Sequence, residues 1–403
     1  MNAASPARPL FRPELLPPTA DGASAAIDAV IAGSTVEPRA YQRRIAAAAV
    51  SMFAGTHRTR PDDEPVPATS VLIESPTGSG KTVMGLSIAA AIQRATGARV
   101  GWVAMRRNLL SQALEENARA GFGLDFTPIS MFDKDPPAVD LLVVDEAQHD
   151  AAASMANLHC RTRPTFTLGL SATPYRTDRI KLCFDRVIRD AGIATLIADG
   201  YLSPYHHYTV PRYTPEVVAG LLSSDPDRWG SSLAFFHRRD ECVDLAERLR
   251  AVDIPCDVVT ATSPREQQLA AFEAGETRVL INMAILVEGF DCPTLKTVFC
   301  RPSGKGCTIQ MAGRVLRRDR NQPFKQIVQC SETRHPMSKT AAPAEQYLWS
   351  PTGWRSLRAN RHLDEITRRS LARIAATPVE LPPIVRAHRT GTGGWWRDRQ
   401  VET

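Results

Sequence analysis

The residues SPTGSGKT, positions 75–82, could bind the phosphate groups of a nucleotide. They follow an apolar run that predicts a strand and precede a pattern that predicts a helix, which is the context a phosphate-binding loop needs. Glycines let main-chain N–H groups turn toward phosphate oxygens, and a helix N-terminus adds a partial positive charge. Lys81 would contact the outer phosphates, and the Thr82 hydroxyl would ligate Mg²⁺. The expected nucleotide-binding residues of the loop are Thr77, Gly78, Ser79, Gly80, Lys81 and Thr82.

One position departs from the strict loop pattern, which asks for Gly where this chain has Ser75. Taken alone, the stretch also fits a glycine-rich turn between a strand and a helix. A second group of residues favours the nucleotide site, because the segment LLVVDEAQH places Asp145 and Glu146 at the end of an apolar strand, 64 residues after Lys81. Asp145 can hold Mg²⁺ through water, and Glu146 can polarise the attacking water in phosphoryl transfer.

Short apolar runs alternate with helical patterns from residue 71 onward, which indicates parallel sheets covered by helices on both faces. The alternation stops at IADGYLSPYHHYTVP, residues 197–211, which we interpret as a linker, and then restarts. The predicted fold is therefore α/β, with two tandem domains. We expect a loose N-terminal arm over 1–35, a first domain over 36–200, a second domain over 201–330, and a basic C-terminal extension over 331–403 that is irregular apart from a helical segment near 362–375.

The composition is that of an ordinary soluble globular protein, with 43% apolar and 23% charged residues in 403. No apolar run approaches the roughly 20 residues that cross a bilayer, and the N-terminus has no apolar signal core. We therefore expect a cytoplasmic protein without a membrane partner. Eight scattered cysteines indicate reduced thiols. A zinc site from Cys300, Cys307, Cys330 and His335 is an alternative whose spacing matches no standard pattern.

The positive charge is concentrated at the C-terminal end of the chain. The formal net charge is +6, and residues 351–403 hold ten Arg and no Lys against five acidic residues, a net of +5. A basic tail with Trp354, Trp395 and Trp396 suggests contact with a polyanion. Two alternatives are a solvated tail and a helix that packs on the second domain through its Trp residues.

Four segments in this order, SPTGSGKT, DEAQH, SATP and QMAGRVLRR, together resemble a superfamily 2 helicase. The resemblance covers roughly residues 36–330. It implies two RecA-like domains with parallel sheets and an ATP site in the cleft between them. In this family the loop usually begins with Ala or Ser, so Ser75 is a family trait. The DEAQH form is closer to the DEAH-like box of repair, recombination and restriction-type helicases than to the DEAD form of RNA-unwinding enzymes.

The resemblance also assigns roles to residues outside the two central motifs. Gln42, in EPRAYQRRI, is expected to contact the adenine, since its amide both donates and accepts. Arg106 and Arg107 are expected to meet the nucleic-acid backbone, or to be plain surface charges. Ser171 to Thr173 resembles the motif that links hydrolysis to movement. The expected cleft residues of the second domain are Gly289, Asp291, Gln310, Arg314 and Arg317, the two arginines sharing one face of a helical stretch and acting as arginine fingers on the γ-phosphate.

These roles imply an ATP-driven motor on nucleic acid, with ATP and Mg²⁺ as cofactors and DNA favoured over RNA. ATP would close the cleft, and hydrolysis would release it. The alternatives are an RNA helicase and an ATP-switched nucleic-acid-binding subunit of a larger restriction, defence or repair assembly, which would have protein partners and no unwinding activity of its own.

Overall fold

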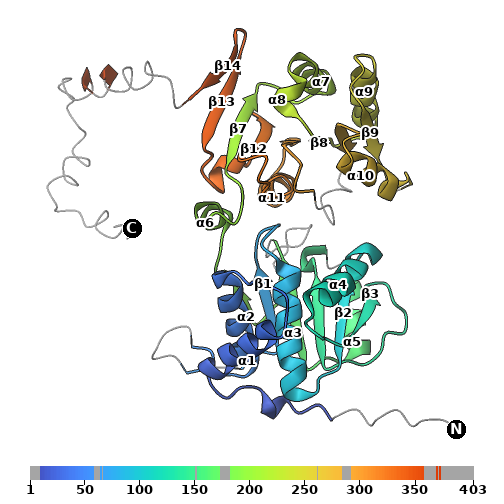
Figure 1. Cartoon of the computed structure of the whole chain (residues 1–403), viewed down its shortest axis with the longest axis vertical. Helices are drawn as coiled ribbons and strands as arrows, with labels where there is room; N and C mark the ends of the chain where they lie inside the picture. Colours follow the sequence, from blue (N-terminus) through green and yellow to red (C-terminus); the bar gives the residue numbers. More distant parts are fainter. Residues whose placement is uncertain are drawn as a thin grey trace, which may run out of the picture.

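The computed structural model describes residues 10–58, 64–65, 67–149, 152–172, 182–260, 262–283, 292–357, 369–370 and 372–373. Within them the chain forms two α/β domains, each built on its own sheet. The domains follow one another along the long axis of the molecule, with α6 (Ile193–Ala198) at their junction (Figure 1). The predicted fold class of two tandem α/β domains with parallel sheets is confirmed.

The first domain has a six-stranded, fully parallel sheet in the order β3-β2-β4-β5-β1-β6. Its strands are β1 (Ser70–Glu74), β2 (Val100–Ala104), β3 (Phe126–Ser130), β4 (Leu141–Asp145), β5 (Phe166–Ser171) and β6 (Arg186–Ile188). Its helices are η1 (Pro13–Leu15), α1 (Ala20–Ala32), α2 (Ala40–Phe53), α3 (Lys81–Thr96), α4 (Arg107–Ala120), η2 (Ala147–His149) and α5 (Ala152–Thr162). All five residues of β4 are buried, as its continuous apolar run predicts for a central strand.

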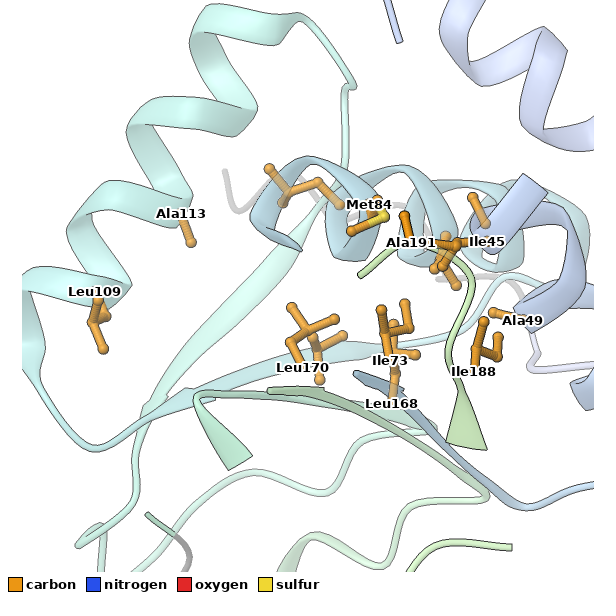
Figure 2. Close-up of a cluster of buried hydrophobic side chains, with 14 of the residues drawn as sticks. Ile45, Ala49, Ile73, Met84, Leu109, Ala113, Leu168, Leu170, Ile188 and Ala191 are labelled. Atoms are coloured by element: carbon orange, nitrogen blue, oxygen red, sulfur yellow. The ribbon is translucent and has the colours of Figure 1, made fainter. Parts of the chain in front are cut away.

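Helices α2, α3 and α4 pack their apolar faces on one side of this sheet (Figure 2). Met84 of α3 lies over Leu168 and Leu170 of β5, and all three side chains are completely buried. Helix α3 lies so close to the sheet that a Cβ added at Gly85 would be 2.7 Å from Leu170 Cδ1. The core therefore fixes the first turn of α3, where the phosphate-binding loop ends.

The expected loose arm over 1–35 is wrong for residues 13–32, which form η1 and α1. Helix α1 packs on α2 and α3 and buries Ala23, Ile27 and Val30. Its N-cap is Thr19, whose hydroxyl accepts a hydrogen bond from Gly22 N at 3.0 Å. The apolar spacing of this helix is carried largely by alanines, so the Pro- and Ala-rich composition concealed a helix that tertiary packing stabilises.

The second domain has an eight-stranded sheet in the order β14-β13-β7-β12-β11-β8-β10-β9. Its strands are β7 (Tyr205–Val210), β8 (Ser232–Phe235), β9 (Cys256–Val259), β10 (Val279–Asn282), β11 (Thr297–Phe299), β12 (Lys325–Cys330), β13 (Glu345–Ser350) and β14 (Gly353–Ser356). All neighbours are parallel except β13 and β14, which form an antiparallel hairpin. Its helices are α7 (Pro215–Ser224), α8 (Pro226–Trp229), α9 (Arg239–Arg250), α10 (Arg265–Glu273), α11 (Lys305–Gly313) and η4 (Met337–Lys339).

Two boundaries of the second domain differ from expectation. The predicted linker over 197–211 contains β7, an internal strand between β12 and β13, so only residues 199–204 connect α6 to the sheet. The predicted irregular extension over 331–403 contributes η4, β13 and β14, and Trp354 packs against Tyr208 and Trp229. Alternating aromatic and polar residues in β13 and β14 let one face join this core. Most of the predicted helical segment near 362–375, together with Trp395 and Trp396, lies outside the described residues.

No helix in the described part of the chain is long and apolar enough to span a membrane. Among the described residues there is also no group of three or more Cys, His, Asp and Glu side chains that could hold a metal ion. The alternative zinc site is therefore not formed. Cys300 and Cys330 are buried, whereas Cys307 is exposed.

Candidate functional site

A cleft of about 670 Å³ lies between the two domains. Its first-domain wall includes Thr77, Gly78, Gly80, Lys81, Thr82, Asp145 and Glu146, and its second-domain wall includes Pro293, Arg314, Arg317 and Arg318. The two linker residues Tyr201 and Leu202 also line it. Because β4 lies beside β5, which lies beside β1, the carboxyl ends of these parallel strands bring the loop and the carboxylates to one edge of the sheet.

The loop between β1 and α3 has the conformation that its glycines predict. Gly78 and Gly80 have φ values of 82° and 79°, in the left-handed region that favours glycine. Lys81 is the first residue of α3 and is 8% exposed. Ser75 N donates a hydrogen bond to Ser171 O at 2.9 Å, so the loop starts against the end of β5. The helix N-terminus and the Lys81 ammonium place positive charge at this end of the cleft.

Residues of α2 hold the loop from behind. Tyr41 Oη and Gln42 Nε2 both donate to Ser79 O, at 2.6 and 2.8 Å. Gln42 Oε1 accepts from Arg39 N at 2.9 Å. A Cβ added at Gly80 would lie 2.4 Å from Gln42 Nε2, so only glycine allows this approach. Gln42, the expected adenine contact, is 7% exposed and is placed on the loop rather than in the lining of the cleft.

Asp145 and Glu146 meet Lys81 at the floor of the cleft. Burial raises the pKa of the Asp145 carboxyl, the Glu146 carboxylate raises it further, and Lys81 lowers it. Glu146 has a φ of 51°, a conformation that is uncommon outside glycine, and its N–H donates to Asp145 Oδ1 at 2.9 Å. Asp145, Glu146 and Thr82 all line the cleft, and carboxylate and hydroxyl oxygens are hard ligands of the kind Mg²⁺ prefers. The donor set therefore fits the expected Mg²⁺.

A hydrogen-bonded chain joins Glu146 to the end of β5. Gln148 Nε2 donates to Glu146 Oε2 at 2.6 Å, and Ser171 Oγ donates to Gln148 Oε1 at 2.5 Å. Gln148 and Ser171 are buried, so their hydrogen bonds are not exchanged with water. The chain fixes the orientation of the Glu146 carboxylate relative to β5. Thr173, which the resemblance assigns to the same motif as Ser171, lies outside the described part of the chain.

Arg314 and Arg317, the expected arginine fingers of QMAGRVLRR, both line the cleft, but they do not share a helix face. Helix α11 ends at Gly313, and Arg314 is its C-cap, so Arg317 lies in the irregular segment that follows. This corrects the expected helical stretch. Arg314 is 5% exposed, and burial lowers the pKa of Arg317 to about 10, which leaves it charged at neutral pH. The loop and the arginine segment lie close together, because a Cβ added at Gly78 would be 3.5 Å from Arg317 Cγ.

The structure places the other sequence-assigned residues in different positions. Gln310, on α11, is half-buried and does not line the cleft. Arg106 and Arg107 lie where β2 leads into α4, half-exposed and exposed, respectively. Gly289 and Asp291 lie outside the described residues. Sequence reasoning missed two residues that line the cleft: Tyr201, which belongs to no recognisable motif, and Arg318, which is the last residue of QMAGRVLRR but was assigned no role.

Two family models match the chain in tandem. "Type III restriction enzyme, res subunit" matches residues 35–125, and "Helicase conserved C-terminal domain" matches residues 214–319. These ranges contain the phosphate-binding loop and the arginine segment. Each match therefore contributes part of one wall of the cleft, and Asp145 and Glu146 lie outside both matches.

One curated relative and two solved structures illustrate the similarity. A "51.5 kDa protein" of a Lactococcus phage (isolate 7-9) is 24% identical over 267 residues, which are 58% of this chain and 59% of the relative. The type ISP restriction-modification enzyme LlaBIII bound to DNA has a TM-score of 0.54 at 16% identity, with 72% of this chain and 27% of that chain covered. Saccharomyces cerevisiae Dbp5, bound to RNA and ADP BeF3, has a TM-score of 0.55 at 16% identity, with 89% and 96% covered.

The solved structures share the fold at low identity, and the sequence matches are partial. The chain spans between 32% and 59% of the length of the curated relatives it matches. The similarity therefore extends over the two-domain unit and its cleft.

Proposed function

The chain belongs to superfamily 2 of the helicases, in the branch related to type III restriction enzymes, and we propose that it hydrolyses ATP in the cleft to move along nucleic acid. The observation that carries the proposal is the composition of the cleft. A phosphate-binding loop with its carboxylates lies on one domain, and two arginines on the other domain line the same cavity. This arrangement supports the proposal, because phosphoryl transfer between two domains needs such groups on each side of the nucleotide.

The loop residues Thr77 to Thr82 would bind the phosphates of ATP. Main-chain N–H groups, the α3 N-terminus and Lys81 supply the positive potential. Glu146, oriented by Gln148, would polarise the attacking water. Arg314 and Arg317 would stabilise the charge that develops on the transferred phosphoryl group. Gln42 would contribute mainly by holding the loop. Gly289 and Asp291 are proposed for the second-domain side on the sequence resemblance, and Gln310 would act from outside the cleft lining.

Thr82 and Asp145 would hold Mg²⁺. The bound ion would neutralise charge on the phosphate oxygens. Burial and the adjacent Glu146 carboxylate raise the pKa of Asp145, and a bound cation would offset both effects. Lys81, which lies beside Asp145, supplies part of that compensation in the protein itself.

DNA is the proposed nucleic-acid substrate. The DEAQH form and the match to the restriction-enzyme family support DNA over RNA, while solved relatives of the same fold are bound to either. Arg106 and Arg107, at the N-terminal end of α4, would contact phosphates of the backbone. Such contacts carry no sequence information, so low sequence specificity is expected.

The test is phosphate release by the full chain with single-stranded and duplex DNA and RNA. We expect stimulation by nucleic acid, strongest with DNA, and turnover abolished in Glu146→Gln while ATP still binds. Absence of stimulation by any of the four nucleic acids would overturn the proposal, and wild-type turnover in Glu146→Gln would overturn the site. Stimulation by RNA alone would overturn the choice of DNA.

A second function, an ATP-switched subunit of a larger assembly, is favoured by one observation. A fragment of a putative HsdR subunit of a type I restriction enzyme from Vibrio vulnificus shares the fold, with a TM-score of 0.54 at 17% identity and 80% of this chain and 70% of that chain covered. Strand displacement on forked duplexes separates the two. Robust ATP-dependent unwinding by the isolated chain supports the motor, and stimulated ATPase without unwinding supports the switch or a pure translocase.

A further inference from the structure

The segment that connects the two domains, residues 199–204, is part of the cleft wall and not a passive tether. Tyr201 and Leu202 line the cleft beside the phosphate-binding loop. The segment runs from α6, at the junction of the domains, into β7 (Figure 1). Its second residue, Gly200, has a φ of 72°, in the left-handed region that lets the chain turn after the end of α6.

The segment is docked on the first domain through Tyr201. The guanidinium carbon of Arg39 lies 5.0 Å from the centre of the Tyr201 ring. The rings of Tyr41 and Tyr201 pack in an edge-to-face arrangement with their centroids 5.4 Å apart. Arg39 Nη1 donates to Tyr41 Oη at 3.1 Å, and Tyr41 Oη donates to Ser79 O at 2.6 Å. The Tyr201 ring is thereby connected to the phosphate-binding loop itself.

The next residue extends this docking. Leu202 is 1% exposed, and a Cβ added at Gly78 would lie 3.2 Å from its Cδ2. A glycine at position 78 therefore serves two purposes, since its backbone adopts a positive φ and its missing side chain leaves room for Leu202.

The same segment is hydrogen-bonded to the arginine segment of the second domain. Ser203 N donates to Leu316 O at 2.8 Å, and Ser203 Oγ donates to Arg317 O at 3.2 Å. Arg318 Nη1 donates to Gly200 O at 2.6 Å. The main chain on both sides of Arg317 is thus held by residues that neighbour Tyr201.

We propose that Tyr201 is a positioning residue of the ATPase: docked on Arg39 and Tyr41, it holds Ser203 so that Arg317 faces the phosphate-binding loop. The inference rests on the proposed function, since it assigns Arg317 a role in hydrolysis. Tyr201 acts through the main chain and does not itself touch the reacting atoms. Its removal loosens Arg317 while the loop, Lys81 and the carboxylates stay intact.

The test compares Tyr201→Ala with Tyr201→Phe, which keeps the ring. In saturating single-stranded DNA, Tyr201→Ala is expected to lower kcat by about tenfold to a hundredfold, the range expected for small misplacement of a catalytic group, with KM for ATP within about threefold of wild type. Tyr201→Phe is expected to match wild type. Arg318→Met, which removes the bond to Gly200, is expected to lower kcat in the same direction by a smaller factor.

A binding measurement makes the test independent of turnover. Titration calorimetry measures the affinity for two ligands. The affinity for ADP tests binding to the first-domain wall, and the affinity for ADP–beryllium fluoride tests binding in the closed cleft. Tyr201→Ala is expected to bind ADP as wild type does and to lose at least about tenfold in affinity for ADP–beryllium fluoride. Tyr347→Ala, a tyrosine of β13 remote from the cleft, controls for general destabilisation: a lower melting temperature with unchanged kcat is expected.

Three results would overturn the inference. They are a wild-type kcat in Tyr201→Ala, a KM that rises while kcat is unchanged, and a Tyr201→Phe variant as impaired as Tyr201→Ala. The second result would mean that the ring contacts the nucleotide itself. A wild-type protein that fails to hydrolyse ATP with every nucleic acid would instead overturn the proposed function, and the two affinities would still test the role of Tyr201.

Discussion

The two walls of the cleft are built in different ways. On the first-domain wall the functional groups come from one loop and the ends of adjacent strands, and hydrogen bonds from α2 and β5 fix them within a single rigid sheet. On the second-domain wall Arg317 lies beyond the end of α11, and its main chain is held through the connecting segment. Under the proposed function, we expect the first wall to bind the nucleotide by itself and the second wall to contribute to hydrolysis through Arg317.

The largest expected loss of activity follows from a substitution in the first-domain wall. Lys81→Ala removes the ammonium at the start of α3, so both binding and turnover are lost: ATP affinity falls, and kcat falls by at least about a thousandfold. Phosphate release and equilibrium ATP binding measure the two losses. If Lys81→Ala lost turnover but bound ATP as tightly as wild type, the first wall would not be the binding wall.

An intermediate effect is expected within the first wall but away from the phosphates. Gln148→Ala removes the donor to Glu146 Oε2 and the acceptor of Ser171 Oγ, so kcat is expected to fall about tenfold while ATP affinity is unchanged. Gln148→Glu keeps the acceptor for Ser171 and loses the donor to Glu146, and it is expected to be at least as slow. A Gln148→Glu enzyme as fast as wild type would show that Glu146 needs no such donor.

The smallest effect is expected where the walls touch. A Cβ added at Gly313 would lie 3.3 Å from Thr77 Cβ, so Gly313→Ala separates the walls by a few tenths of an ångström. We expect kcat to fall about threefold to tenfold with ADP affinity unchanged, because the first wall is intact. Gly306→Ala, on the same helix with no atom within 4 Å of the added Cβ, is the control and should match wild type. Equal rates for the two variants would contradict close contact of the walls during turnover.

The two walls also differ in how far the sequence reveals them. The phosphate-binding loop, Asp145 and Glu146 are found from short contiguous patterns, because a strand, a loop and a helix N-terminus form the site locally. The place of Gln42 is harder to predict, since its amide meets Ser79 only through the packing of α2 behind the loop. The sequence around Gln42 does not show whether its side chain contacts the adenine or holds the phosphate-binding loop in place.

Features that depend on contacts between residues distant in the sequence cannot be predicted from local sequence patterns. Helix α1 is rich in Ala and follows Pro-rich residues, so only its burial on α2 and α3 identifies it. Strands β13 and β14 follow an irregular stretch and are defined by pairing with β7 and with each other. Tyr201 has no motif at all, because its function comes from meeting Arg39 and Tyr41 at the domain junction.

The central claim is that hydrolysis requires Arg317 from the second wall at a nucleotide bound on the first. The most direct test is phosphate release with saturating ATP and single-stranded DNA, compared between wild type and Arg317→Met, together with the affinity of each for ADP. The account predicts stimulated turnover in the wild type, a loss of about 10³-fold or more in the variant, and equal ADP affinities. An Arg317→Met enzyme that keeps the stimulated wild-type rate would contradict it.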